Sequence, residues 1–124
     1  MQRDMNLVRQ ILLKIEEHEH GRAQRSLDIA DYSEDQIGYH VYIMIEGGLL
    51  EGADVTQMGS KTFEAIPTRL TWAGHEFLDA ARDDSRWNRA LQTARDQAGS
   101  VTIGVMTQLL TAMMKQSLGL GGAT

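Results

Sequence analysis

The chain has 124 residues, 42% of them hydrophobic and 23% charged, which fits one ordinary soluble domain and excludes a disordered or membrane-embedded chain. Seventeen acidic against twelve basic residues give a net charge of -5, which disfavours nucleic acid unless the basic residues gather on one face. The absence of cysteine excludes disulfides, thiolate zinc sites and cysteine nucleophiles, and fits a reducing compartment. No signal-like apolar run follows Met1, so we expect a cytoplasmic protein.

The first predicted element is an amphipathic helix over residues 4–17. Its apolar residues recur at helical spacing, with polar residues between them: Leu7, Val8, Ile11, Leu12 and Ile15. Gly21 is expected to end this helical stretch. Residues 22–32 then mix short polar and apolar side chains, which predicts a short strand or an extended connection.

A second helix is predicted to begin after Ser33, a good N-cap. Gln36 stands three residues later and completes a capping box. Gly47 and Gly48 are expected to end the helix, because glycine readily takes the left-handed conformation found at helix C-termini.

A β-hairpin is predicted next, with strands at residues 49–55 and 63–70. The polar residues 56–61, which include Gly59, form its turn. Pro67 has no backbone donor, so the returning strand is expected at a sheet edge.

Three more helices are predicted towards the C-terminus. Thr71 caps the first of them, whose buried stripe is Gly74, Phe77, Leu78 and Ala81. The acidic run at residues 83–85 either kinks this helix or caps a fourth, with the apolar stripe Trp87, Ala90, Leu91, Ala94 and Ala98. A last helix follows Gly99 over residues 102–118, with Ile103, Met106, Leu110, Met113 and Met114 along one side.

This order predicts a mainly α (α+β) fold, a winged helix-turn-helix-like domain with one small antiparallel sheet and extra C-terminal helices. We expect the winged-helix domain to cover residues 1–98. Residues 99–118 then form a helix available for oligomerisation, and residues 119–124 a frayed tail.

Several motifs resemble the YjcQ-like family of small proteins from bacteria, phages and prophages, a domain of unknown function. They are Arg3-Asp4-Met5, Ile11-Leu12-Leu13-Lys14-Ile15-Glu16, Tyr32-Ser33, Tyr39-His40 and Pro67-Thr68-Arg69-Leu70-Thr71-Trp72-x-Gly74-His75-Glu76-Phe77-Leu78-Asp79-Ala80-Ala81-Arg82-Asp83. The resemblance covers the chain to about Leu118 and implies a winged-helix fold without implying an activity. Only residues 27–32 are available for the helix that normally precedes a recognition helix, which disfavours insertion into a DNA groove.

The second helix is the predicted partner-binding surface. Helical geometry places Ile37, His40, Val41, Met44 and Ile45 on a core-facing side, and Asp35, Tyr39, Tyr42, Ile43 and Glu46 on the other. The outer side has no Lys or Arg to read DNA, whereas aromatic anchors in a polar rim are typical of protein interfaces. The alternative is that Tyr39, Tyr42 and Ile43 pack beneath the C-terminal helices.

Two polar groups could bind ligands. Arg82, Arg86 and Arg89 would share a helical face, as a candidate phosphate contact, if the third helix continued through Asp83; the alternative is a solvated surface paired with neighbouring aspartates. Residues 16–20, Glu-Glu-His-Glu-His, could hold a metal with His40 or His75, but an exposed polar helix end is the favoured interpretation.

The sequence contains no phosphate-binding glycine loop, nucleophile elbow or zinc-protease motif. We therefore expect no metal, no cofactor and no catalysis. Polar residues interrupt the last helix, so we expect no membrane interaction. Its apolar side is predicted to pair with a second copy, and the alternative is that it packs on its own domain. The sequence thus favours a non-catalytic protein that binds another protein, with a DNA-binding regulator or a small-ligand-binding oligomer as the alternatives.

Overall fold

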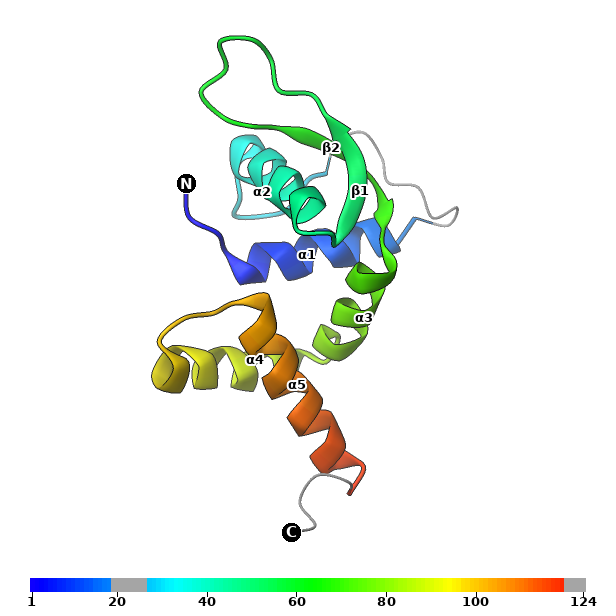
Figure 1. Cartoon of the computed structure of the whole chain (residues 1–124), viewed down its shortest axis with the longest axis vertical. Helices are drawn as coiled ribbons and strands as arrows, with labels where there is room; N and C mark the ends of the chain where they lie inside the picture. The colour runs from blue at the N-terminus through cyan, green and yellow to red at the C-terminus, as the bar shows by residue number, and fades with distance from the viewer. Residues whose placement is uncertain (19–26, 120–124) are drawn as a thin grey trace. The chain divides into compact units, whose positions relative to one another are not determined.

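Five α-helices, a short π-helix and one two-stranded antiparallel sheet form the part of the chain that the computed structural model describes, residues 1–18 and 27–119 (Figure 1). The prediction of a mainly helical fold with one small antiparallel sheet is confirmed. The elements, in chain order, are α1 (Met5–Glu16), α2 (Glu34–Glu46), β1 (Leu50–Asp54), β2 (Ala65–Leu70), α3 (Trp72–Ala81), α4 (Asp84–Thr93), η1 (Ala94–Ala98) and α5 (Ile103–Ser117).

Two compact units divide the chain, residues 1–76 and residues 77–124. The sequence predicted a domain boundary later in the chain, after residue 98. The helix α3 begins in the first unit and ends in the second. The second unit holds α4, η1 and α5 together, and α5 packs against both of the others.

The first helix forms as its apolar pattern predicts. Asp4 is its N-cap, and the carboxylate accepts hydrogen bonds from the backbone N–H groups of Asn6 and Leu7. The five apolar residues of the predicted stripe are all buried, and α1 packs against α2 and β2. The predicted stop at Gly21 and residues 22–26 of the following segment lie outside the described residues.

The described part of the connection to α2 is not a strand. Residues 27–29 have no regular secondary structure, and residues 30 and 31 form a turn. Asp31 takes a φ of 75°, in the left-handed region that aspartate tolerates better than most residues. The described residues of this segment are therefore an irregular connection that contains a turn.

The hairpin packs on α2 and carries a bulge in β2. Leu50 pairs with Leu70 and Glu51 with Arg69, but Gly52 pairs with Pro67, so Thr68 is an extra residue on β2. The bulge changes the phase of alternation so that Pro67 and Leu70 are both buried. Each strand of a two-stranded sheet is an edge strand, which confirms the position predicted for the proline.

Side chains cap both helices that follow α3, at Asp83 within the predicted acidic run and at Thr102, where the last helix was predicted to begin. Asp83 accepts a hydrogen bond from the Arg86 N–H and caps α4, and Thr102 accepts one from the Val105 N–H and caps α5. Trp87 is 1% exposed, and its ring meets that of Phe77 edge-on, with 6.0 Å between centroids.

One residue of the fourth predicted stripe is corrected by the structure: Ala98 is exposed, whereas the other four are buried. The reason is that residues 94–98 form a π-helix, whose wider turn moves Ala98 off the line that an α-helix would follow. Gly99, at φ 72°, ends this segment as predicted.

Candidate functional site

The second helix carries the candidate site, and its ends are set by local sequence. The Ser33 hydroxyl accepts from the Gln36 N–H at 3.1 Å, while the Gln36 side chain accepts from the Ser33 N–H at 2.8 Å. This confirms the predicted capping box. Gly47 is the C-cap, and Gly48 follows with a φ of 84°. The helix therefore spans the predicted residues and fixes which side chains share each face.

The inner face of α2 packs in the core of the N-terminal unit. Ile37, Val41 and Met44 are buried, as predicted. His40, 1% exposed, accepts a hydrogen bond at Nε2 from the Asp4 N–H, with a distance of 2.9 Å. Its Nδ1 lies 2.8 Å from the Gln36 carbonyl oxygen and must therefore carry the proton. Both ring nitrogens are engaged in a neutral imidazole, so His40 joins α1 to α2 and is structural.

Asp4 also binds the segment before α2. Tyr32 donates its hydroxyl hydrogen to Asp4 Oδ2 at 3.0 Å. Partial burial of the phenol raises the pKa of Tyr32, and the hydrogen bond to Asp4 and the charges of Asp4 and Asp31 raise it further. Asp4, at the start of α1, is thus hydrogen-bonded both to Tyr32 before α2 and to His40 within α2.

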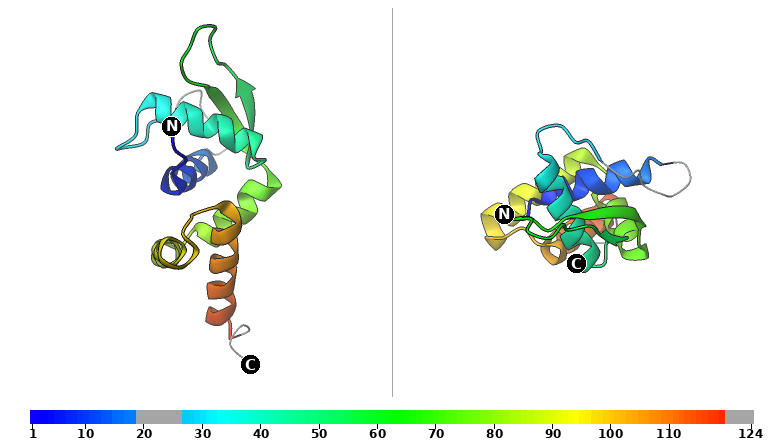
Figure 2. Two further views of the ribbon diagram at one scale, coloured as in Figure 1. Left: turned by 60° about the vertical axis from the view of Figure 1, so that its left-hand side comes forward. Right: turned by 90° about the horizontal axis from the view of Figure 1, so that it is seen from above.

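A second face of α2 lies beneath the hairpin (Figure 2). A Cβ atom on Gly38 would come within 2.9 Å of Glu64 Cγ, so the missing side chain admits the end of the hairpin loop. Ile45, predicted to face the core, instead lies under β1, where a Cβ on Gly52 would meet its Cδ1 at 2.7 Å. The helix α2 therefore packs on two sides, against α1 and against the hairpin, and only the remaining side is open to solvent.

Hydrogen bonds to Thr56 fix the end of the hairpin loop. The Glu64 N–H donates to Thr56 Oγ1 at 2.9 Å, and that hydroxyl donates to the Glu64 carbonyl at 3.2 Å. The Thr56 N–H in turn donates to Asp54 Oδ1, and these bonds from Thr56 lower the pKa of Asp54. The residue before Glu64 is consequently held close to α2.

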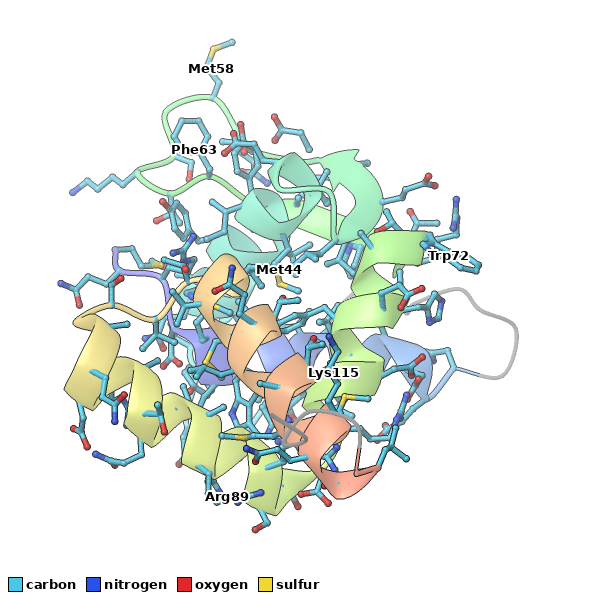
Figure 3. The ribbon with its side chains drawn as sticks, turned by 60° about the horizontal axis from the view of Figure 1, so that its bottom comes forward. Met44, Met58, Phe63, Trp72, Arg89 and Lys115 are labelled. Atoms are coloured by element: carbon cyan, nitrogen blue, oxygen red, sulfur yellow. The ribbon has the colours of Figure 1, made fainter. Side chains whose placement is uncertain are left out.

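That residue is Phe63, and its ring stacks on Tyr42. The ring centroids are 5.0 Å apart and the planes differ by 26°. Phe63 nevertheless stays 55% exposed. Figure 3 shows Phe63 on the hairpin loop, with Met58 projecting from the loop tip. Tyr39 is half-buried one turn away and meets His40 edge-on, with 6.0 Å between centroids. We call Tyr39, Tyr42 and Phe63 the aromatic patch.

Carboxylates surround this patch. Asp35 and Glu46 are exposed on the strip of α2 that also carries Tyr39, and Glu64 is exposed beside Phe63. We call these three residues the acidic rim. Residues 34–70 contain six acidic and two basic residues, and of the two, Arg69 pairs with Glu51 at 2.8 Å. The site is therefore a partly open aromatic surface in a negative field.

The structure brings most of the predicted site residues of α2 together but changes their setting. Asp35 and Glu46 are exposed, while Tyr39, Tyr42 and Ile43 are half-buried. The residue that covers Tyr42 is Phe63, which the sequence placed in a strand. Gly38 was the available signal for this contact, because a glycine inside a helix often marks a close approach by another segment.

The three arginines of the candidate phosphate contact do not share one helix. The structure ends α3 at Ala81 and begins α4 at Asp84, because Asp83 caps the new helix. The continuous face that the contact required is thus absent. Arg82 pairs with Asp79 at 2.8 Å, and Arg86 is half-buried while Arg89 is exposed on α4 (Figure 3).

The last helix uses only part of its predicted stripe within the chain. Met106 and Leu110 are fully buried, whereas Ile103, Met113 and Met114 are half-buried. Two buried residues therefore attach α5 to its own unit, and the other three remain partly accessible.

Metal binding and membrane insertion find no support among residues 1–18 and 27–119. These residues contain no cluster of three metal-ligating side chains, and none of their helices has the length and apolar character to cross a bilayer. Glu19 and His20 of the polar cluster lie outside the described residues. His75 is exposed on α3.

Comparisons with known proteins are consistent with one another. A family model described as a hypothetical protein, DUF2513, matches residues 2–100. A protein from Haemophilus influenzae, named as an uncharacterised protein, is 29% identical over 119 residues, which cover 95% of this chain and 99% of that protein. No solved structure matches the chain.

Proposed function

The chain belongs to the DUF2513 family, and we propose that it is a non-catalytic, cytoplasmic winged-helix protein that acts by binding another protein through the aromatic patch and its acidic rim. The family description names no activity. The proposal therefore rests on the geometry of residues 1–76.

The order of elements supports the winged-helix part of the proposal. In this interpretation α1 is the first helix, α2 occupies the place of the recognition helix and the β1–β2 hairpin is the wing. The YjcQ-like motifs agree with the same assignment and with an origin in bacteria, phages or prophages. The short connection before α2 departs from a DNA-binding winged helix, since the described residues 27–33 contain no helix.

One observation carries the binding proposal: Phe63 stacks on Tyr42 and still exposes 55% of its surface. Three hydrogen bonds that join Val55 or Thr56 to Glu64 hold the ring in place, so the chain fixes an apolar side chain at its surface. Rigid, exposed aromatic side chains in a polar rim supply much of the energy at protein interfaces.

Site-specific photo-crosslinking in the native host tests this proposal. Benzoylphenylalanine would replace Phe63 in one variant and Trp72 in a control, since Trp72 is 80% exposed on α3 (Figure 3). We expect a discrete protein adduct from position 63, and excess wild-type protein but not Phe63→Ala protein should compete for it. Equal adducts from both positions, or none from position 63, would refute the proposed surface.

DNA binding is the competing function, and charge opposes it. The exposed cation of the hairpin loop is Lys61, whereas α2 carries Glu34, Asp35 and Glu46. We expect no sequence-specific binding in mobility shifts at low salt. Nanomolar, salt-sensitive binding to a defined duplex would favour the DNA-binding regulator instead.

The proposal includes self-association through α5. Ile103, Met113 and Met114 are half-buried, and this helix contains no acidic residue in a chain of net charge -5. Two copies can therefore meet there without the repulsion that acidic surfaces would cause. Sedimentation should show a dimer that Met114→Lys dissociates. A monomeric wild-type chain at high concentration would contradict this part of the proposal.

A further inference from the structure

We infer that the aromatic patch binds an arginine-bearing, basic segment of the partner, with a guanidinium group stacked on the open face of Phe63. This inference rests on the proposed function and specifies the chemistry of the partner.

The ring geometry leaves one face of Phe63 available. Tyr42 covers one face in a stacked arrangement with 5.0 Å between centroids, yet the side chain stays 55% exposed. The negative charge density on a ring face attracts cations, and the planar guanidinium of arginine stacks on such a face better than a strongly hydrated ammonium group.

The exposed strip of α2 has an acidic residue at each end and two aromatic rings between them. Helical spacing aligns Asp35, Tyr39, Tyr42 and Glu46 in one row, with a carboxylate at each end and two tyrosines between them. Asp35 and Glu46 are eleven positions apart, which is about 16 Å along the helix axis. An extended segment of about five residues would span this distance. A basic segment lying along this row would meet a carboxylate on either side of the rings.

Glu46 has no evident role in stabilising α2. It lies at the C-terminal end of the helix, where the partial negative charge of the helix dipole disfavours a carboxylate, and the last turn contains no basic residue. Asp35, in contrast, lies in the favourable first turn. A residue that opposes a local stability rule is expected where function requires it, and a basic partner would give Glu46 such a role.

The charge of this surface favours a cationic partner segment over an acidic peptide or a nucleic acid. Six acidic residues against two basic ones in residues 34–70 repel an acidic peptide or a nucleic acid, and Arg69 is already paired with Glu51. Glu64 places a further carboxylate beside Phe63, with its side chain over Gly38 of α2. The same residues that exclude polyanions thus attract arginine.

Binding of defined peptides to the full chain tests the inference. The probes are octa-arginine, octa-lysine and octa-glutamate, followed by NMR of the aromatic and backbone signals at fixed ionic strength. We expect octa-arginine to shift the ring signals of Phe63, Tyr39 and Tyr42 and to bind about fivefold more tightly than octa-lysine, the size of an exposed cation–π contact. Octa-glutamate should not bind.

Matched variants separate the ring from general acidity. Phe63→Leu keeps an apolar side chain without the π face and should weaken octa-arginine binding about fivefold, whereas Trp72→Leu should leave it unchanged. Glu46→Gln, an exposed change that relieves an unfavourable dipole interaction, should weaken binding about threefold without lowering the melting temperature. Melting curves of each variant show that the chain remains folded.

Three results would overturn the inference: equal binding by Phe63→Leu and wild type, an equal loss in Trp72→Leu, or peptide shifts that leave the aromatic patch unchanged. The outcome is separable from that of the proposed function. A protein adduct at position 63 together with no octa-arginine binding would retain the interface and reject the basic partner. Octa-arginine binding without any adduct would reject the interface in the cell.

Discussion

The two units of the chain differ in charge and in what they expose. Thirteen of the seventeen acidic residues lie in residues 1–76, against seven of the twelve basic residues. Residues 77–124 contain four acidic and five basic residues. Of the exposed large apolar side chains, Met1, Met58, Phe63 and Trp72 belong to the N-terminal unit and Leu118 to the C-terminal unit, so both exposed aromatic rings lie in the N-terminal unit. The negative field and the exposed aromatics thus occur in the same unit, which is why the proposed interface lies there.

The two units are also held together differently. In the N-terminal unit, polar bonds join residues far apart in sequence, such as Asp4 N–H to His40 and the Thr71 hydroxyl to the Gly48 carbonyl at 2.6 Å. In the C-terminal unit, buried apolar side chains such as Trp87 and Leu110 join the helices. Single polar changes should therefore affect the N-terminal unit most, whereas buried apolar side chains stabilise both units, so a cavity should be costly in either.

The two tryptophans give the largest expected contrast. Trp87→Ala removes a side chain that is 1% exposed and should lower the free energy of unfolding by about 4 kcal/mol. Trp72→Ala removes one that is 80% exposed and should change it by less than about 0.5 kcal/mol. Urea denaturation measures both, and similar losses would show that Trp72 is buried in solution.

Two glycines test close packing in one unit against open space in the other. A Cβ on Gly74 would lie 2.1 Å from the Leu49 carbonyl oxygen, so Gly74→Ala should cost about 3 kcal/mol. On Gly104 of α5 the nearest atom would be 3.9 Å away, and Gly104→Ala should stabilise by up to about 1 kcal/mol. Melting of both variants measures the difference, and a mild Gly74→Ala would contradict this packing.

Two helix caps differ in whether the capping side chain also forms a hydrogen bond to a distant residue. Asp4→Ala removes the cap of α1 and also the acceptor of the Tyr32 hydroxyl, so it should cost about 2 kcal/mol. Thr102→Ala removes only the cap bond to Val105 and should cost about 1 kcal/mol. Equal losses, measured by denaturant unfolding, would mean that the Tyr32 bond adds no stability.

Alkaline pH should give the smallest effect, confined to the N-terminal unit. The folded state raises the pKa of Tyr32 above its ordinary value of 10.0 by favouring the neutral phenol. Its contribution to stability is therefore complete below pH 10 and is lost as pH rises through the higher pKa of the folded state. Tyr32→Phe should lose stability less steeply above pH 10 in melting scans. A profile identical to that of the wild type would refute this coupling.

Local signals in the sequence predicted the helices and caps well. Ser33 with Gln36, Thr71 and, within the acidic run, Asp83 accept capping hydrogen bonds at the helices that begin beside them, because capping depends only on residues a few positions apart. The sequence left alternatives open at two places. Residues 22–32 could form a short strand or an extended connection, and the acidic run at residues 83–85 could kink the third helix or cap a fourth. In the structure, residues 27–31 are an irregular connection with a turn, and Asp83 caps a new helix.

Contacts between distant segments limited the prediction of the candidate site. Periodicity identified the exposed acids and the tyrosines of α2, but it could not show that Phe63 would leave the strand and stack on Tyr42. That contact joins residues 21 positions apart in sequence, and it depends on the space that Gly38 leaves for Glu64 and on the hydrogen bonds of Thr56 to the loop. The exposure of Ala98 likewise depends on a π-turn that α-helical spacing does not anticipate.

The extra residue Thr68 in β2 lets the hairpin keep its strand faces although one strand is a residue longer than the other. If Thr68 took a place of its own in the ladder, the pairing would shift by one residue and turn Ala65 and Pro67 to the face opposite Leu70, which would carry buried side chains into water. Deleting Thr68 would instead remove the bulge and keep these three residues on one face. Residues added at the loop tip, beside Gly59 and the fully exposed Met58, would leave both strand faces unchanged. Natural insertions, tags or grafted peptides should therefore be accepted at the tip, and a hairpin that lacks Thr68 should keep the same buried face.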